Sequence, residues 1–418
     1  MNTLSQAAPH AASPFPAIDP VASHILVTPL DLGGSGLRVA VKDTIDIAGL
    51  PTRAGSQVYA DAAPASAHAQ VVERLLAQGC RIVGKANLHE MAFGVTGVNP
   101  HTGTALNPYF PHHVPGGSSS GSAAAVAAGI ADFALGTDTG GSVRTPACCC
   151  GVFGLKTTFG RVSRIGVAPA RSSLDCVGPF AVDAAMLTRA MAIIDPSFTP
   201  LSLARIPVLG LLSVSASRAV SAAFAEALAA AAVELRPARV EGLDDAYEAG
   251  LTIINFENWV AFGPLTASPA MGADVRLRLL GAARTTPEMV AAANGVRARV
   301  SAAVDAALDA VDALVLPTMP DVPPRLEEAG DARAAIGITR FVRAFNLTGH
   351  PALTVPVLTT EGLPAGIQLV GRKGDDARLC AIAEWLSSRL PADRIPGRAR
   401  AKAAFAAARA DHPRSEEE

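Results

Sequence analysis

The sequence predicts an α/β fold in which a mixed central β-sheet is flanked by helices on both faces. From about residue 37 to residue 390, segments that alternate as strands do follow segments with helical spacing. Half of the 418 residues are hydrophobic and 17% are charged, which is ample for a large core. No internal repeat or linker divides the chain. We therefore expect a surface segment over 1–30, one domain over 31–395 and a helical, frayed acidic tail over 396–418.

The first elements predict a β–α–β unit. Leu37–Lys42 alternates in the manner of a strand, and Arg81–Gly84 is a second strand. Between them Ala67–Gln78 has helical spacing, and Gly79 suits the left-handed position that ends many helices. This order places Lys42 at the edge of a sheet where the active sites of open α/β folds lie.

The rest of the chain continues the alternation. We expect helices at Val182–Ile194, Ala216–Leu235, Asp244–Trp259, Pro287–Val311 and Ala377–Leu390, and strands at Ile130–Leu135, Pro207–Leu212, Ala313–Leu316, Leu353–Val357 and Gly366–Gly371. Asp244 suits a helix N-cap and Pro287 a first helical residue. The proline- and alanine-rich start is expected to wrap the surface, with order beginning near Leu37.

Two glycine-rich loops that carry serines lie close together within 115–156. Gly116–Ser122 runs into Ala123–Ala128, a strong helix former, so its amides stand at a helix N-terminus where an anion is welcome. Gly136–Ser142 follows an apolar run and lets the backbone turn its N–H groups inward around Ser142. The second loop therefore predicts an oxyanion hole.

A serine in such a loop needs a base, and the chain offers few lysines. Lysine and arginine together number 35, but only five are lysines. Arginine does not give up its proton in a protein, whereas a desolvated lysine does. Lys42 ends a strand in a position where burial would favour the neutral amine, so it is the candidate base.

These residues resemble the amidase signature family of serine hydrolases. The match is carried by Gly116–Gly121, by Gly136–Arg144 and by the lysine of the run from Val41 to Asp46. Weaker family motifs extend across most of the chain, at Gly84–Glu90, Asn107-Pro108, Leu316–Thr318, Asn346–Ala352 and Gly362–Leu369. The resemblance implies a Ser–cis-Ser–Lys triad that consists of Ser142 as nucleophile, Ser118 as bridging serine and Lys42 as base.

We also expect roles for the other residues of the second loop. The backbone N–H groups expected to hold the oxyanion are those of Thr139, Gly140, Gly141 and Ser142. Asp138 is expected to stabilise the loop by accepting backbone N–H bonds, and a direct catalytic role for it stays open. Arg144 is expected to rigidify the loop through an ion pair or a backbone carbonyl. No cofactor and no metal is needed for this chemistry.

Other interpretations of the first loop are weaker. Gly117–Gly121 matches G-x-S-x-G, the nucleophile elbow, with Ser119 as nucleophile. The elbow needs a strand directly before it, and Tyr109–Pro115 contains two prolines that argue against one. A phosphate-binding P-loop would need Lys followed by Ser or Thr where this chain has Ser122-Ala123. His112-His113 is expected to be a surface or loop-packing pair.

Composition limits the partners. A formal net charge of −2 gives no electrostatic case for nucleic acid, and no apolar run reaches the length of a membrane span. The six cysteines form neither a disulfide framework nor a metal-ligand spacing, and Cys148–Cys150 is expected to pack in the core. We expect a cytoplasmic protein whose partner is a small-molecule amide, with a homodimer left open.

The expected reaction is hydrolysis of a small primary amide to carboxylic acid and ammonia. Met91, Phe93 and Val95 suggest an apolar wall, and His113–Ser122 resembles the compact indole-3-acetamide hydrolases, so an aromatic or other apolar acyl part is expected. Small carboxylated amides or ureas, of the malonamate or carboxybiuret type, are the alternative and would need an arginine in the pocket. An amidotransferase A-type subunit that makes ammonia for a partner and a catalytically dead scaffold also stay open.

Overall fold

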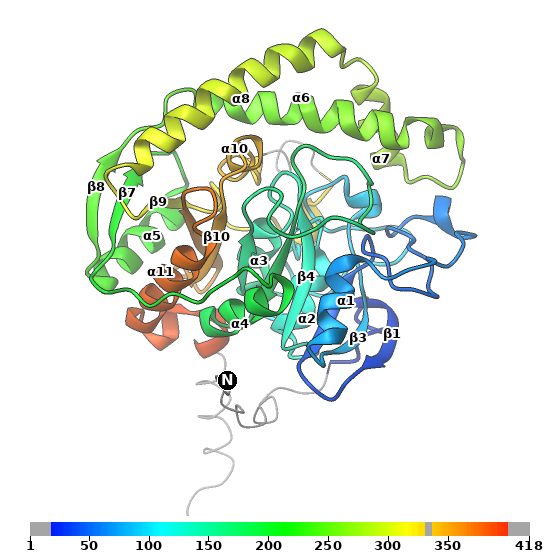
Figure 1. Cartoon of the computed structure of the whole chain (residues 1–418), viewed down its shortest axis with the longest axis horizontal. Coiled ribbons are helices and arrows are strands. Elements are labelled where there is room, and N and C mark those ends of the chain that lie inside the picture. Colours follow the sequence, from blue (N-terminus) through cyan, green and yellow to red (C-terminus); the bar gives the residue numbers. More distant parts are fainter. Residues whose placement is uncertain (1–17, 331–336, 400–418) are drawn as a thin grey trace, which may run out of the picture.

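One mixed β-sheet runs through the molecule. The computed structural model describes residues 18–330 and 337–399. Its strands are β1 (Leu26–Gly33), β2 (Arg38–Lys42), β3 (Arg81–Ala86), β4 (Phe133–Asp138), β5 (Phe153–Lys156), β6 (Cys176–Ala181), β7 (Val208–Leu212), β8 (Glu234–Ala238), β9 (Ala313–Pro317), β10 (Ala352–Leu358) and β11 (Pro364–Val370). They form one 11-stranded sheet in the order β1-β3-β2-β4-β6-β5-β10-β11-β9-β7-β8 (Figure 1).

The sheet combines two parallel groups with antiparallel pairs. β2 is parallel to β3 and β4, and β7 is parallel to β8 and β9. The remaining neighbours, from β4 through β6, β5, β10 and β11 to β9, are antiparallel, as are β1 and β3. The predicted mixed α/β fold is therefore confirmed.

Helices cover both faces of this sheet (Figure 1). They are α1 (Gln70–Ala77), α2 (Ser120–Ala127), α3 (Arg144–Cys150), α4 (Ala184–Ile194), α5 (Arg218–Ala231), α6 (Leu243–Phe262), α7 (Ala273–Ala282), α8 (Pro287–Leu308), α10 (Arg343–Leu347) and α11 (Asp376–Arg389). Short 3-10 helices lie at Gln57–Tyr59, Glu90–Ala92, Gly263–Ala267, Leu326–Glu328 and Ala392–Arg394.

Strand alternation distributes the core between the two faces. In β2, Val39 and Val41 join the apolar cluster that contains residues of α1, α4, α5 and α11. Ala40 points to the other face, into the cluster with α2 and α3. In β9, Leu314 and Leu316 join a third cluster with α6, α8 and α10. Lys42 is two residues from Ala40, so alternation directs its side chain toward the face that carries α2 and α3.

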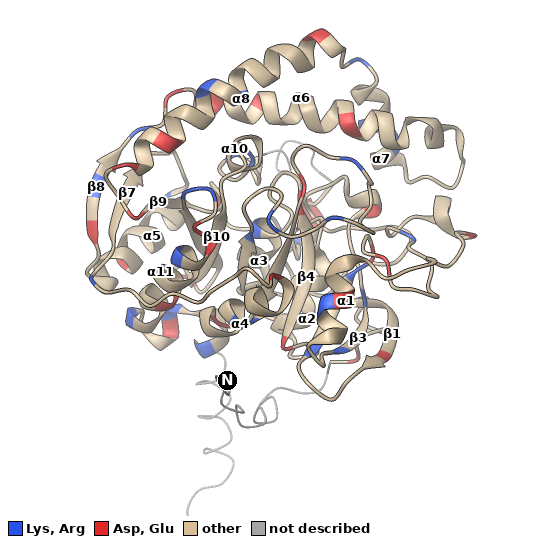
Figure 2. Cartoon of the chain, viewed as in Figure 1, with Lys and Arg blue, Asp and Glu red and all other residues tan. Residues whose placement is uncertain are grey.

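The two longest helices, α6 and α8, lie side by side across one end of the molecule (Figure 1). α10 packs beneath α6. Lys and Arg are interspersed with Asp and Glu over the ribbon, without a large region of one sign in this view (Figure 2). Among the described helices, none is long and apolar enough to cross a lipid bilayer.

Most predicted elements are present, with bounds that differ by a few residues, but the expectation of order beginning near Leu37 is wrong. Residues Leu26–Gly33 form β1, which pairs antiparallel with β3. This strand lies at the edge of the sheet and many of its side chains are half exposed, so it lacks the buried alternation that identifies inner strands. Of the predicted terminal segments, residues 1–17 and 400–418 lie outside the described part of the chain.

The predicted helix Ala216–Leu235 is also wrong at its end. α5 stops at Ala231 because Ala232 adopts a left-handed conformation, with φ 51°, and the chain then enters β8. The expected N-cap at Asp244 is corrected as well: the N-cap of α6 is Gly242, and Asp244 lies in the first turn, where its charge suits the helix dipole. Pro287 is confirmed as the first residue of α8. The elements β6, β8, α3, α7 and α10 were not predicted.

Candidate active site

Three segments bring Lys42, Ser118 and Ser142 to one edge of the sheet. Lys42 is the last residue of β2, and Ser142 lies in the loop between β4 and α3. Because β2 and β4 are parallel neighbours, their carboxyl ends lie at the same edge. Ser118 stands just before α2, a helix that packs against both β2 and β4. The sheet and α2 therefore place the three side chains that the family resemblance implied at the same edge of the sheet.

Lys42 is completely buried and hydrogen-bonded to hydroxyl groups. Its Nζ donates to Ser118 Oγ at 2.8 Å and to Thr137 Oγ1 at 2.8 Å. Burial lowers the pKa of Lys42 to about 7, against the opposing attraction of Asp175 and Asp138. About half of the molecules therefore carry a neutral amine near pH 7. A neutral amine can accept the proton of the serine that it now contacts.

Ser118 is fixed by close backbone packing. The peptide bond between Gly117 and Ser118 is cis. The Ser118 carbonyl accepts a hydrogen bond from the N–H of His89 at 3.0 Å. A Cβ atom at residue 117 would lie 2.8 Å from the backbone nitrogen of Gly97, so only glycine fits there. The backbone contacts of the first glycine loop thus fix Ser118 in the position where its hydroxyl contacts Lys42.

The second loop presents free amides around Ser142. The N–H groups of Thr139, Gly140 and Ser142 make no hydrogen bond to another described residue. The expectation that Gly141 also serves the oxyanion needs correction, because its N–H donates to Asp138 Oδ1 at 2.7 Å. Within the described part of the chain, the two serine hydroxyls of the triad make no hydrogen bond to each other, and such contacts often tighten only when substrate binds.

Asp138 organises this loop from below. Its carboxylate accepts the N–H groups of Gly141, Val143 and Arg144, at 2.7, 3.1 and 3.3 Å. The Arg144 guanidinium also donates to both carboxylate oxygens, at 3.0 and 2.9 Å. Burial alone would raise the pKa of Asp138, but the charge and hydrogen bonds of Arg144 hold it well below its ordinary value. The carboxylate of Asp138 is therefore an anion at any physiological pH. It stabilises the loop by accepting hydrogen bonds from the loop's backbone N–H groups.

Arg144 connects the nucleophile loop to the C-terminal part of the chain. Its Nη1 donates to the carbonyl of Val342 at 2.7 Å and to Gln368 Oε1 at 2.8 Å, and its Nη2 donates to Asn346 Oδ1 at 2.5 Å. The side-chain amide of Asn346 returns to the carbonyl of Asp138 at 2.7 Å. Sequence reasoning missed all three partners of Arg144, since they lie about 200 residues away along the chain.

The expected apolar wall does not form as one surface. Met91 lines a cavity of 370 Å³, together with Thr44 and Phe262. Phe93 is partly buried between two apolar clusters. Val95 packs on the cluster that contains Cys148 and Cys149. Of the three, only Met91 therefore lines this cavity, which reaches the segment that follows Lys42.

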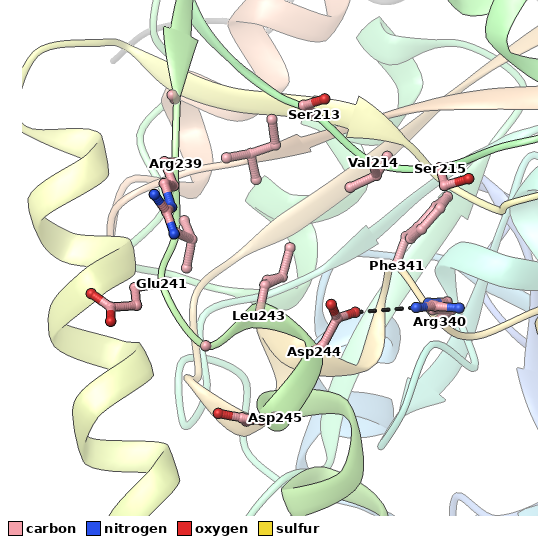
Figure 3. A pocket seen from close by; sticks show the side chains of 14 residues that line it. Ser213, Val214, Ser215, Arg239, Glu241, Leu243, Asp244, Asp245, Arg340 and Phe341 are labelled. Carbon is pink, nitrogen blue, oxygen red and sulfur yellow. Dashed lines mark hydrogen bonds and ion pairs between the residues drawn. The ribbon is translucent and has the colours of Figure 1, made fainter.

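Two further cavities lie outside the loops of the triad. One of 800 Å³ shares Tyr59, Ala168 and Phe262 with the 370 Å³ cavity and is largely apolar. The other, of 710 Å³, lies at the ends of β7 and β8 and at the start of α6, and Figure 3 shows the ion pair between Asp244 and Arg340 in it. None of its lining residues comes from the glycine loops, so we do not assign it to the amide substrate.

The rejected alternatives find other roles in the structure. Ser119 is completely buried, and its Oγ donates to the carbonyl of Thr137 at 3.3 Å, so the hydroxyl faces packed protein. A nucleophile elbow needs a strand directly before it, and residues 109–115 form no strand. Lys85 forms an ion pair with Asp43 at 2.7 Å. Cys148–Cys150 is buried in the core, as predicted.

The fold and the arrangement of these groups define an enzyme that acts on carbon–nitrogen amide bonds. The Amidase family model matches residues 32–380. The chain is 36% identical to the A-type subunit of the glutamyl-tRNA(Gln) amidotransferase of Methanosarcina barkeri, over 82% of each chain. It is 33% identical to Amidase 1 of Oryza sativa subsp. japonica, over 84% of this chain and 90% of the relative. A solved crystal structure of an amidase superposes with a TM-score of 0.78 at 35% identity, covering 85% of each chain. The chain belongs to the amidase signature family of Ser–cis-Ser–Lys hydrolases.

Proposed function

We propose that this protein hydrolyses a small primary amide to a carboxylic acid and ammonia through an acyl-enzyme on Ser142. The observation that carries the proposal is the contact between the buried amine of Lys42 and Ser118 Oγ, at 2.8 Å, with the pKa of the lysine near 7. A lysine in its ordinary state would be protonated and could not serve as a base.

In the first half of the reaction, Ser142 gives its proton to Ser118, which gives its own to neutral Lys42. The Ser142 oxygen attacks the amide carbonyl carbon, and the negative charge that develops on the carbonyl oxygen is stabilised by the N–H groups of Thr139 and Gly140 and of Ser142 itself. The carbon–nitrogen bond then breaks, and the proton returns through Ser118 to the leaving nitrogen, which departs as ammonia.

In the second half, water attacks the acyl-enzyme. Lys42 again receives a proton by way of Ser118. The ester bond to Ser142 then breaks to release the acid, and the proton returns from Lys42 through Ser118 to the Ser142 oxygen. The same three N–H groups stabilise the second oxyanion. Because Asp138 and Arg144 hold the loop in place before substrate arrives, little reorganisation is needed in either step.

The acyl part is expected to be largely apolar. The cavity that Met91 lines and the larger one that adjoins it offer mostly carbon surface. An aromatic or other apolar acyl group therefore fits the walls on the Lys42 side of the site.

A fluorophosphonate probe tests the assignment of the nucleophile. We expect one adduct, on Ser142, located by peptide mapping, and loss of labelling in Ser142→Ala. Ser119→Ala is the matched control, since it removes a neighbouring buried hydroxyl and should label normally. An adduct on Ser119 would restore the nucleophile elbow and discard the lysine mechanism.

A second function is favoured by the relatives that are A-type subunits of glutamyl-tRNA(Gln) amidotransferases. In that case the ammonia would pass to a partner protein that acts on charged tRNA. The near-neutral net charge of −2 gives this chain itself little attraction for tRNA. Purification of the tagged chain from its own cells decides between the two. A stable second chain, with low glutaminase activity of the chain alone, supports the amidotransferase role, and full activity of the isolated chain on amides supports the free amidase.

A further inference from the structure

A buried arginine lies beside the oxyanion loop and takes no part in the network described above. Arg343 is the first residue of α10. Its side chain runs between two glycines: a Cβ atom at Gly140 would lie 3.4 Å from its Nε, and one at Gly250 would lie 3.0 Å from its Cγ. Gly140 stands two residues before Ser142. The guanidinium is therefore adjacent to the loop that surrounds the reacting carbonyl.

Arg343 has few partners for a buried charge. Only 8% of the residue is exposed. Its Nη2 donates to Thr339 Oγ1 at 2.9 Å, and its guanidinium carbon lies 4.1 Å from the centre of the Tyr247 ring. Its Nε and Nη1 are buried and have no hydrogen-bond partner among the described residues, nor does it form an ion pair with a described carboxylate. Arg144, which is completely buried, has acceptors on all three nitrogens.

A buried guanidinium without an anion is costly, so it persists only where something compensates. The Tyr247 ring offers a modest attraction over one face of the guanidinium, and the in-plane N–H groups of Nε and Nη1 stay without an acceptor among the described residues. Of these two nitrogens, Nε lies beside Gly140 of the reacting loop. A carboxylate is the acceptor that arginine binds best, through charge-assisted hydrogen bonds.

We propose that Arg343 is a specificity residue that binds a carboxylate on the acyl part of the substrate. This inference rests on the proposed amidase function but replaces the largely apolar acyl part expected above by one that ends in a carboxylate. The substrate class is then the monoamides of dicarboxylic acids. The charged end of the acyl part meets Arg343 next to Gly140. The reacting amide carbonyl then faces the free N–H groups of the loop.

The test compares anionic and neutral amides of matched size. Ammonia release is measured from malonamate and succinamate and from their uncharged counterparts propionamide and butyramide, with wild type, Arg343→Met and Arg340→Met. Arg340 is the matched control, since it lies three residues earlier, is exposed and pairs with Asp244. We expect wild type and Arg340→Met to prefer the anionic amides. Arg343→Met should lose about 10- to 100-fold of that preference in kcat/KM, mainly through KM.

A binding measurement tests, without turnover, whether Arg343 binds a carboxylate. Succinate should raise the thermal unfolding temperature of the wild-type chain and slow fluorophosphonate labelling of Ser142, whereas butyrate at the same ionic strength should do neither. Arg343→Met should lose the succinate effect. The unfolding temperature of each variant without ligand shows whether the variant folds. If Arg343→Met does not fold, Arg343→Lys, which keeps the charge, takes its place in the comparison.

The outcomes separate the two proposals. If neutral amides are hydrolysed and Arg343→Met changes neither their rates nor the preference, the carboxylate site is wrong and the amidase stands. If kcat falls equally for anionic and neutral amides, Arg343 only supports the loop, and the proposed specificity is overturned. If no amide is hydrolysed and Ser142 is not labelled, but succinate still stabilises the wild type alone, the amidase assignment fails and the carboxylate site remains.

Discussion

The pH dependence of the rate tests the role of Lys42 directly. Burial lowers its pKa from 10.5 to about 7. The neutral fraction of the lysine is then about one half at pH 7, about 1% at pH 5 and nearly complete at pH 9, whereas an unperturbed lysine would be neutral in roughly one molecule in 3000 at pH 7. Since only the neutral amine accepts a proton, kcat/KM should rise about tenfold per pH unit below 7 and level off above it. The expected difference between pH 5 and pH 9 is about 100-fold.

The matched variants are Lys42→Ala and Lys85→Ala. Lys42→Ala should lose about 10²- to 10⁴-fold in kcat, together with the inflection near pH 7. Lys85→Ala removes an equally buried lysine that pairs with Asp43, so it should lower stability but keep the inflection. Ammonia release across pH 5–9 and thermal unfolding give both quantities. A Lys42→Ala variant within about tenfold of wild type, or a wild-type rate that is flat across this range, would refute the lysine base.

Two other predictions concern the nucleophile loop. Asp138→Asn leaves Arg144 as an uncompensated buried charge and should lower the free energy of unfolding by about 3–5 kcal/mol in urea titration; an effect below about 1 kcal/mol would mean that the ion pair contributes little. Gly141→Ala should abolish probe labelling, because φ is 118° there and the new Cβ would lie 2.3 Å from Val342 Cγ2. Gly49→Ala has φ 81° with open space around it, so it should cost only about 1–2 kcal/mol and label normally; equal labelling of both variants would contradict this explanation.

The fold could be predicted from hydrophobic periodicity where strands and helices are buried on a regular face. Periodicity failed where tertiary structure overrides local rules. Pro179 lies inside β6, and a proline argues against an inner strand because it cannot donate a backbone hydrogen bond. β6 tolerates it because β5 pairs with β6 only at Phe180 and Ala181, whereas β4 pairs along the whole strand. β8 was missed because its side chains are largely exposed at the edge of the sheet and it also contains a proline. Ala232 ends α5 in a left-handed conformation that alanine seldom adopts.

The triad could be predicted because its residues lie in short motifs whose glycines are themselves informative. Lys42, Ser118 and Ser142 were each recognisable from neighbouring residues, and the resemblance supplied their roles. The partners of Arg144 and the position of Arg343 could not be found in this way. They depend on how α10 and β11 pack against a loop about 200 residues earlier, and the chain contains 35 Lys and Arg residues among which sequence alone does not choose.

The hydrogen bonds of Arg144 to residues near the C-terminus also have a consequence for the protein during its synthesis. Ser142 leaves the ribosome long before Gln368, which is 224 residues beyond Arg144 and accepts one of its hydrogen bonds. Until α10 and β11 have emerged and docked, Asp138 and Arg144 lack the acceptors and donors that hold the oxyanion loop. A nascent or truncated chain therefore carries all three triad residues without an assembled site. We therefore expect a chain truncated before β11 to contain the triad residues and to lack amidase activity.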